Sequence, residues 1–122
     1  MLIPLVIILV DQSGLLLKKT ILRPRPWAGM TPELVNHLVA QKGINYSFPS
    51  NHAANISGLA IVFTAIYDQY KYLFWSIAGI VIFSRVYIGV HYPSDVISGW
   101  LIGTLYGLFL IKSWEYFNRD KP

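Results

Sequence analysis

Residues 84–95 read SRVYIGVHYPSD and lie between two long apolar segments. If the helix of the preceding segment continues to Val90, the Tyr92–Pro93 pair is expected to end it. His91 then stands at a helix end, and Asp95 lies just inside the following helix. A carboxylate in that position can hold one imidazole nitrogen and leave the other free to act.

A simpler interpretation of the same stretch stays open at this point. In it, Arg85 and Asp95 form an ion pair at a membrane boundary, where polar residues collect, and His91 is a capping residue. The residue type of Ser94, in contrast, predicts the cap of the next helix under the first interpretation. The rest of the chain has to decide between the two interpretations.

The composition indicates a membrane protein. The chain has 122 residues, enough for one domain, and is 54% hydrophobic with a mean hydropathy of +0.46. Charged residues make up 13%, against about 25% in a soluble domain. There is no cysteine, which excludes a disulfide framework and thiol chemistry. The net charge of +4 favours an anionic lipid surface or an anionic substrate, and the lack of a long basic tract argues against nucleic acid.

Apolar runs of about one bilayer thickness recur along the chain. They extend from Leu2 to about Leu22, from Pro49 to about Tyr67, from Tyr72 to Val90 and from Ser94 to about Ile111. The first run has no basic leader and no cleavage site, so it is interpreted as a spanning helix rather than a signal peptide. We therefore expect an all-α integral membrane bundle of about four transmembrane helices, forming a single domain over residues 1–122.

The connection between the first two runs carries signals of its own. Residues 31–33 (Thr-Pro-Glu) are typical of a helix start, and Lys42–Gly43 of a helix end. The apolar stripe between them predicts a short amphipathic helix in the membrane interface. His37 lies on this helix and is interpreted as a surface histidine.

Two features inside the spans are interpreted as packing features. Asp11 is costly in a bilayer unless it faces protein or water, so it is predicted to be a hydrogen-bond partner within the bundle. Gly99, Gly103 and Gly107 recur every four residues, a stripe that lets another helix approach closely. The same stripe could join two copies of the chain in a homo-oligomer.

Counting the crossings places three polar clusters on one membrane face. They are Lys18 to Arg25, Pro49 to His52, and Arg85 to Asp95. Each has a simpler interpretation: the first as a lipid-headgroup anchor, the second as a helix cap with an incidental histidine. Arg25, however, lies between two prolines, and a rigid arginine suits a fixed anion better than a fluid headgroup. Their convergence favours a site.

Together these residues have the chemistry of a phosphate site. The candidates are Lys18, Arg25, Ser50, Asn51, His52, Arg85, His91 and Asp95. Cations and a helix N-terminus bind a tetrahedral oxyanion. One histidine can attack while the other donates a proton. Two-metal phosphatase sites need several carboxylates, and Asp95 is the one clearly available on this face, so no metal or cofactor is expected.

The three clusters resemble the signature of the type 2 phosphatidic acid phosphatase superfamily, which includes lipid phosphate phosphatases and vanadate haloperoxidases. The matching segments are Lys18 followed by Arg25–Pro26, then Pro49-Ser50-Asn51-His52, then Ser84–Arg85 with His91 and Asp95. The second departs from the family's Pro-Ser-Gly-His, with Asn51 in place of glycine. Asn tolerates unusual backbone angles better than most residues, so the phosphate-facing amide is expected to be retained.

The resemblance implies a role for each residue. His91 would be the nucleophile that forms a phosphohistidine, with Asp95 orienting it. His52 would protonate the leaving oxygen, after which water would hydrolyse the intermediate. The remaining candidates would hold the phosphoryl oxygens: Lys18, Arg25, Arg85, Ser50 and the backbone of Asn51. Preorganised donors of this kind usually supply the largest share of the rate.

The resemblance further implies a metal-independent hydrolase of a lipid phosphate or diphosphate, with its site on the extracytoplasmic face of a bacterial inner membrane. Membrane members of the family usually have six spans, and this sequence begins at what corresponds to the third. It is then a fragment, a sequence with a mis-assigned start or a minimal form. Two alternatives stay open: a vanadate-dependent haloperoxidase-like enzyme, and a catalytically silent membrane protein that binds lipid phosphates.

Overall fold

The apolar runs of the sequence fold as long helices in the computed structural model, which describes residues 1–34 and 46–119. The regular elements of these two ranges are helical, and the all-α prediction is confirmed for them. In chain order they are α1 (Leu2–Ile21), α2 (Pro26–Gly29), the 3-10 turn η1 (Pro32–Leu34), α3 (Asn51–Ile66), the 3-10 turn η2 (Asp68–Tyr70), α4 (Lys71–Tyr87) and α5 (Pro93–Asn118).

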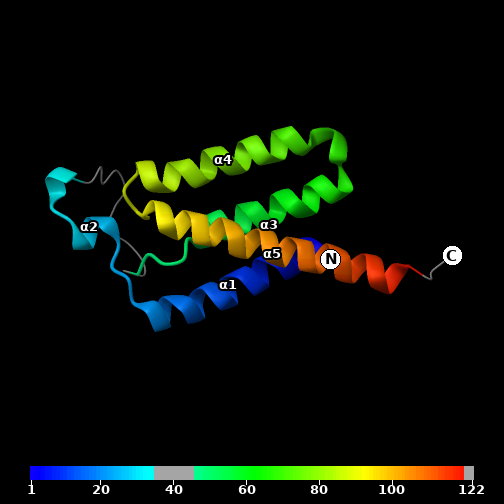
Figure 1. Cartoon of the computed structure of the whole chain (residues 1–122), viewed down its shortest axis with the longest axis horizontal. Helices are drawn as coiled ribbons and strands as arrows, with labels where there is room; N and C mark the ends of the chain where they lie inside the picture. Colours follow the sequence, from blue (N-terminus) through cyan, green and yellow to red (C-terminus); the bar gives the residue numbers. More distant parts are fainter. Residues whose placement is uncertain (35–45, 120–122) are drawn as a thin grey trace.

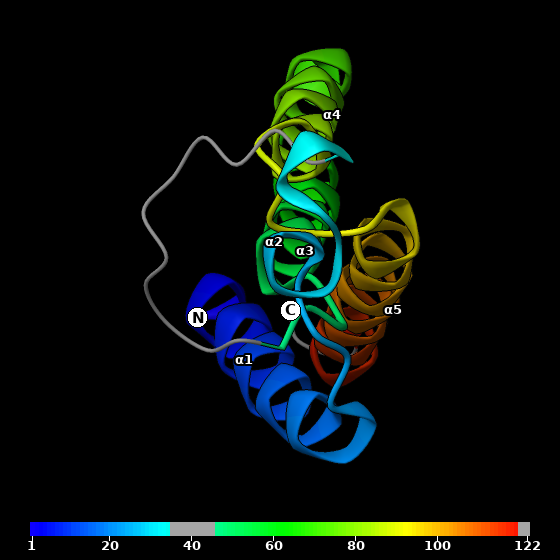
Figure 2. The same cartoon turned by 90° about the vertical axis from the view of Figure 1, so that its left-hand side faces the viewer.

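Helix α3 is the centre of the bundle. It packs most extensively against α5 and also against α4 and α1, so the other three long helices surround it (Figures 1 and 2). The buried core joins Val6 and Val10 of α1 to Ala54 of α3 and Leu110 of α5. Small residues dominate the buried face of α3, which is why three neighbours can approach it.

The glycine stripe of α5 lies against α3. A Cβ atom added at Gly103 would overlap the Ala54 carbonyl, and one at Gly99 would overlap the Ser50 carbonyl. All three glycines of the stripe are buried. The predicted close helix approach is therefore confirmed, and it occurs within the chain. The sequence also allowed a homo-oligomer formed through these glycines. Such an oligomer would use the glycine face of α5, which α3 already covers.

Helix α5 is the one helix in the described ranges that is long and apolar enough to cross a membrane by length and composition. Helices α3 and α4 are shorter, with 16 and 17 residues. The 20 residues of α1 include Asp11, Lys18 and Lys19. Large apolar side chains nevertheless face outward on α4 and α5, including Ile80, Phe83, Leu105 and Phe109.

The end of α4 differs from the sequence-based prediction. The helix stops at Tyr87 instead of continuing to Val90. Gly89 has a φ of 76°, a left-handed conformation that a helix cannot contain. The backbone N–H of Ile88 still donates to the Ser84 carbonyl, at 3.0 Å, and completes the last turn. His91 therefore follows a tight turn rather than extending the helix.

The start of α5 is capped by a different residue from the one predicted. Pro93 is the first helical residue, and Asp95 accepts a 2.8 Å hydrogen bond from the Tyr92 backbone N–H. Ser94 lies inside the helix and does not cap it. At its other end α5 continues to Asn118, beyond the predicted end near Ile111.

The polar clusters meet at one end of the bundle, as the crossing count predicted. Helix α2, the start of α3 and the α4–α5 turn lie together there, whereas η2, the start of α1 and the end of α5 lie toward the other end (Figure 1). Of the predicted interfacial helix, only the short turn Pro32–Leu34 falls within the described residues. The rest of that prediction, including His37 and Lys42–Gly43, falls outside them.

Candidate active site

His91 is held in place by the turn that ends α4. Its side chain is buried, with 4% of its surface exposed. Its backbone N–H donates to the Arg85 carbonyl at 3.2 Å, and the N–H of Val90 donates to the same carbonyl at 3.3 Å. The Arg85 carbonyl thus fixes the backbone of the histidine.

The imidazole of His91 lies between a carboxylate and a guanidinium. Nδ1 is 3.6 Å from Oδ2 of Asp95, slightly longer than a hydrogen bond. Nε2 is 3.4 Å from Nη1 of Arg25, which is positioned to donate to it. A proton on Nδ1, facing Asp95, leaves the lone pair of Nε2 directed toward Arg25. This is the orientation that a nucleophilic histidine needs if Arg25 binds the anion it attacks.

Burial lowers the pKa of His91 below its ordinary value, because the charged imidazolium would lose its hydration. The side chain of Asp95 opposes this effect, and the positive charges of Arg25 and Lys18 add to it. The net direction is downward, so His91 is neutral near pH 7 and its nucleophilic lone pair is available.

Asp95 is buried with no exposed surface and is held from two sides. Oδ2 accepts from the Tyr92 backbone N–H, as described above, and Oδ1 forms a 2.9 Å ion pair with Nη1 of Arg23. The partner of Asp95 is therefore Arg23, and the Arg85–Asp95 ion pair of the simpler interpretation is not formed. Arg85 instead donates from Nε to the hydroxyl of Ser84, at 3.3 Å.

Two of the predicted cations are anchored by backbone carbonyls. Arg25 donates from Nη1 to the Val90 carbonyl at 2.9 Å. Lys18 is buried on α1, and its ammonium group donates to the carbonyl of Pro49 and, at 3.5 Å, to that of Ser47. These bonds join the end of α1 to the loop before α3, and the Arg25 segment to the α4–α5 turn that carries His91.

Ser50 joins the start of α3 to the start of α5. Its hydroxyl oxygen caps α3 by accepting from the Ala53 N–H at 3.3 Å, as the sequence predicted. Its own backbone N–H donates to the Asp95 carbonyl at 3.0 Å. The helix N-terminus that could receive an anion is therefore fixed beside the His91–Asp95 pair.

Asn51, which stands where the similar motif has glycine, turns its side chain toward α1. Its amide donates to Oδ1 of Asp11 at 3.3 Å, and Asn55 donates to the same oxygen at 3.0 Å. Gly14 leaves the space for this side chain, since a Cβ at Gly14 would lie 2.9 Å from Cγ of Asn51. The prediction that Asp11 is a hydrogen-bond partner within the bundle is confirmed.

His52 is exposed and lines a different pocket from His91. The His52 pocket has a volume of about 300 Å³ and is also lined by Asp11, Asn51 and Asn55. His91 lines a pocket of about 350 Å³ on the side of α2 and the α4–α5 turn. His52 is close enough to feel the charges of Arg85, Arg25 and His91. Arg25 is therefore the cation that lies within electrostatic range of both histidines among the charges that act on them here.

Arg23 is a residue that the sequence did not single out. Besides its ion pair with Asp95, Nη1 donates to the Ser94 hydroxyl at 2.6 Å, and the guanidinium lies 4.5 Å from the centre of the Tyr92 ring. Its place two residues before Arg25 was a possible signal, because alternate residues of an extended segment share a face. Its partner is 72 residues away in the sequence, and only the fold reveals the contact.

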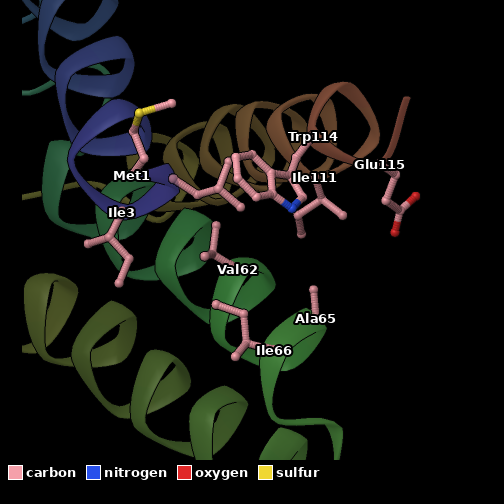
Figure 3. Close-up of a pocket in the computed structure, with 9 residues that line it drawn as sticks. Met1, Ile3, Val62, Ala65, Ile66, Ile111, Trp114 and Glu115 are labelled. Atoms are coloured by element: carbon pink, nitrogen blue, oxygen red, sulfur yellow. The ribbon is translucent and has the colours of Figure 1, made fainter. Parts of the chain in front are cut away.

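A cavity larger than either histidine pocket lies at the opposite end of the molecule. It has a volume of about 410 Å³ and is lined by apolar side chains of α1, α3 and α5, with Trp114 and Glu115 at one side (Figure 3). None of its lining residues is a histidine, arginine or lysine. It therefore lacks the basic side chains that an anion site needs. Its larger volume does not make it a better candidate for the active site than the cluster around His91.

Comparison with known proteins gives a family match over most of the chain. The family model described as PAP2 superfamily matches residues 1–119. The chain is 35% identical over 86 residues to a lipid A 4'-phosphatase of Porphyromonas gingivalis, covering 69% of this chain and 36% of that protein. It is 36% identical over 81 residues to an undecaprenyl-diphosphatase of Sulfolobus acidocaldarius, covering 66% and 38%. The chain thus spans well under half the length of these relatives.

Two solved structures have a similar fold. LpxE of Aquifex aeolicus matches with a TM-score of 0.75 and 30% identity, over 90% of this chain and 65% of that one. A transmembrane PAP2-type phosphatidylglycerolphosphate phosphatase of Bacillus subtilis matches with a TM-score of 0.72 and 28% identity, over 98% and 61%.

Proposed function

The chain belongs to the PAP2 superfamily, and from this premise we propose that it is an integral membrane phosphatase acting on a lipid phosphate, through a phosphohistidine and without a metal. The observation that carries the proposal is the setting of His91. Its Nδ1 faces the buried Asp95 carboxylate at 3.6 Å, and its Nε2 faces Arg25 at 3.4 Å. A neutral imidazole oriented in this way is a nucleophile directed at the place where an anion would bind.

In the first step, Nε2 of His91 attacks phosphorus, a P–N bond forms and the P–O bond to the lipid breaks. His52 gives its proton to the departing oxygen. In the second step, His52 takes a proton from water, the water oxygen attacks phosphorus and the P–N bond breaks. Inorganic phosphate leaves, and both histidines return to their starting states.

The cations bind the oxygens of the phosphoryl group and stabilise their negative charge. Arg25 already lies beside Nε2, so a bound phosphoryl oxygen would be its natural partner. We assign the same task to Lys18 and Arg85, together with the N-terminus of α3 at Ser50 and Asn51. The proposal involves no metal because Asp95, the carboxylate that faces His91, is already engaged by Arg23 and the Tyr92 N–H.

The membrane part of the proposal rests on the outward faces of the helices. We propose four spans, α1, α3, α4 and α5, in a single domain over residues 1–122, with the site on the extracytoplasmic face of a bacterial inner membrane. Exposed apolar side chains such as Phe83 and Phe109 suit contact with lipid tails. A lipid substrate could then reach the site from the bilayer.

The test is phosphate release by the detergent-purified chain in excess EDTA, with phosphatidic acid, phosphatidylglycerol phosphate and a prenyl diphosphate as substrates. His91→Ala is expected to abolish release. The matched control is Lys71→Ala, which removes an exposed side chain at the opposite end and should leave the rate unchanged. Release that EDTA abolishes, or that survives in His91→Ala, would contradict the mechanism. Phosphate-sensitive lipid binding without turnover would instead support the silent binding protein.

A further inference from the structure

The pocket beside His52 has a polar wall that the proposed function does not yet use. Asp11 contributes to it from α1, and Asn51 and Asn55 contribute from α3. Its remaining lining residues are apolar: Ile56, Leu59 and Val81. A carboxylate is thus present in the same pocket as the proposed proton donor, midway along α1, a proposed span in which isolated charges are costly.

The two oxygens of Asp11 have different surroundings. Oδ1 accepts both amide hydrogen bonds, from Asn51 at 3.3 Å and Asn55 at 3.0 Å. These donors stabilise the negative charge and fix the carboxylate. Oδ2 accepts no hydrogen bond from the part of the chain that the structure describes. Since each amide nitrogen carries two hydrogens and a carboxylate only accepts, this wall offers a spare acceptor and spare N–H donors.

The geometry of phosphoryl transfer indicates which part of the substrate would occupy this pocket. In phosphoryl transfer the attacking and leaving atoms are roughly in line on opposite sides of phosphorus. His91, the nucleophile, lines the pocket on the α2 side, and His52, the proton donor, lines this one. An oxygen that takes its proton from His52 must be close to His52. The leaving group therefore lies beside Asp11.

We infer that the pocket formed by Asp11, Asn51, His52 and Asn55 receives the leaving group, and that Asp11 selects a leaving group without negative charge that carries hydrogen-bond donors. The substrate class is then a phosphomonoester whose alcohol bears hydroxyl or amide groups, such as a glycerol- or sugar-based lipid. A lipid diphosphate is disfavoured. The inference rests on the proposed function, because it uses the roles of His91 and His52.

The two substrate classes differ in the charge that develops beside Asp11. In a monoester the P–O bond breaks, its electron pair goes to the alcohol oxygen and the proton from His52 makes a neutral alcohol. In a diphosphate the departing oxygen belongs to the inner phosphate, which leaves as an anion. Asp11 and an anionic leaving group in the same pocket repel each other, and a repulsion that lowers the rate about tenfold corresponds to about 1.4 kcal/mol.

The test compares farnesyl phosphate with farnesyl diphosphate, which share one hydrocarbon, using the intact chain in detergent. The quantity measured is the ratio of kcat/KM for the monophosphate to that for the diphosphate. We expect the wild type to favour the monophosphate, and Asp11→Asn to reduce the ratio about tenfold. A monoacylglycerol phosphate should exceed farnesyl phosphate in the wild type, because its hydroxyl can donate to Asp11.

Two control variants test whether the charge of Asp11, rather than a general change in the structure, sets the ratio. Asp11→Glu keeps the charge and should keep the preference for the monophosphate. Asp68→Asn removes an exposed carboxylate at the opposite end, one that pairs with Lys71 at 3.4 Å, and should leave the ratio unchanged. A ratio that is the same in Asp11→Asn and in the wild type would overturn the inference and leave the phosphatase function standing.

The wild type alone provides an independent measurement if Asp11→Asn fails to fold. A diphosphate is the more reactive anhydride, so a wild-type preference for the farnesyl monophosphate would have to come from the enzyme. A preference for the diphosphate would overturn the inference. Release of phosphate from none of the substrates would overturn the proposed function, and the inference with it.

Discussion

At the scale of single residues, Arg23 determines how Asp95 is presented to His91. It pairs with Oδ1 while Oδ2 faces the imidazole, so the carboxylate cannot rotate away. Removing the Arg23 guanidinium would leave the buried negative charge of Asp95 without its ion-pair partner. We therefore predict that Arg23→Gln lowers kcat on the order of tenfold with little change in KM.

Steady-state phosphate release across a range of substrate concentrations checks this prediction. Arg23→Lys keeps the charge and should recover part of kcat. A side chain that acted only on substrate binding would raise KM at constant kcat, and that result would contradict a positioning role for Arg23.

The pH dependence follows from the pKa of His91. Burial holds this pKa below 6.5, and the attacking nitrogen must be unprotonated. The logarithm of kcat/KM should therefore fall as the pH drops, with a midpoint below 6.5. Because the charge of Arg25 lowers the same pKa, Arg25→Gln should move that midpoint upward, in addition to slowing the reaction. A pH–rate profile of both proteins checks the shift, and a midpoint that moves downward would contradict this sign.

Residue types and spacing were enough to predict much of the candidate site. The motif residues Lys18, Arg25, His52, His91 and Asp95 lie at one end of the bundle, although the roles given to them stay predictions. Spacing could not reveal which arginine pairs with Asp95, because Arg23 and Arg85 are both cations near a helix end. The choice depends on how the segment after α1 crosses the start of α5.

At the scale of elements, the contact between α3 and α5 depends on the absence of side chains along one stripe. A methyl group at Gly103 would overlap the Ala54 carbonyl, which is backbone and cannot rotate away. We predict that Gly103→Ala destabilises the fold by about 1–3 kcal/mol, as overpacking does elsewhere. Thermal unfolding in detergent should show a lower midpoint.

Gly79 of α4 provides the matched control for Gly103. A Cβ at Gly79 meets nothing within 4 Å, so Gly79→Ala should leave the unfolding midpoint unchanged or raise it slightly through helix propensity. Equal destabilisation by both variants would indicate that helix backbone effects, rather than the α3–α5 contact, determine the result.

The helix boundaries show where sequence patterns stop being informative. The pattern placed the end of the third helix at Val90, because Tyr92–Pro93 was the strongest stop signal. The structure ends it at Tyr87, where Gly89 adopts a φ of 76°. A glycine in an apolar run is compatible with a helix or with a turn. Local hydrogen bonds from Val90 and His91 to the Arg85 carbonyl hold the turn, together with the bond from Arg25 to the Val90 carbonyl. Arg25 is distant in the sequence, so no local pattern contains that last contact.

At the scale of the whole molecule, the crossing count predicted which polar clusters meet, because successive helices of a bundle alternate in direction. Helix length was less predictable. The run that ends near Ile111 continues as helix to Asn118, since the polar and aromatic residues of that last stretch are compatible with helix once α5 has formed. Composition alone could not distinguish the end of an apolar run from the end of the helix.

The polar clusters lie at one end of the bundle and η2 at the other, so the orientation of the chain in a membrane can be tested with one label at each end. Met30, at the end of α2, lies at the active-site end and is 43% exposed. Asp68 begins η2 at the opposite end, where its side chain is 76% exposed. The sequence has no cysteine, so Met30→Cys and Asp68→Cys each introduce a single thiol into an otherwise unreactive chain.

If the site faces the extracytoplasmic side, a membrane-impermeant maleimide should label Met30→Cys in intact cells and label Asp68→Cys only after the membrane is permeabilised. The reverse pattern would put the site on the cytoplasmic side, and its lipid substrate in the inner leaflet. Labelling of both thiols in intact cells would mean that the bundle does not separate the two compartments, which would contradict the four-span arrangement itself.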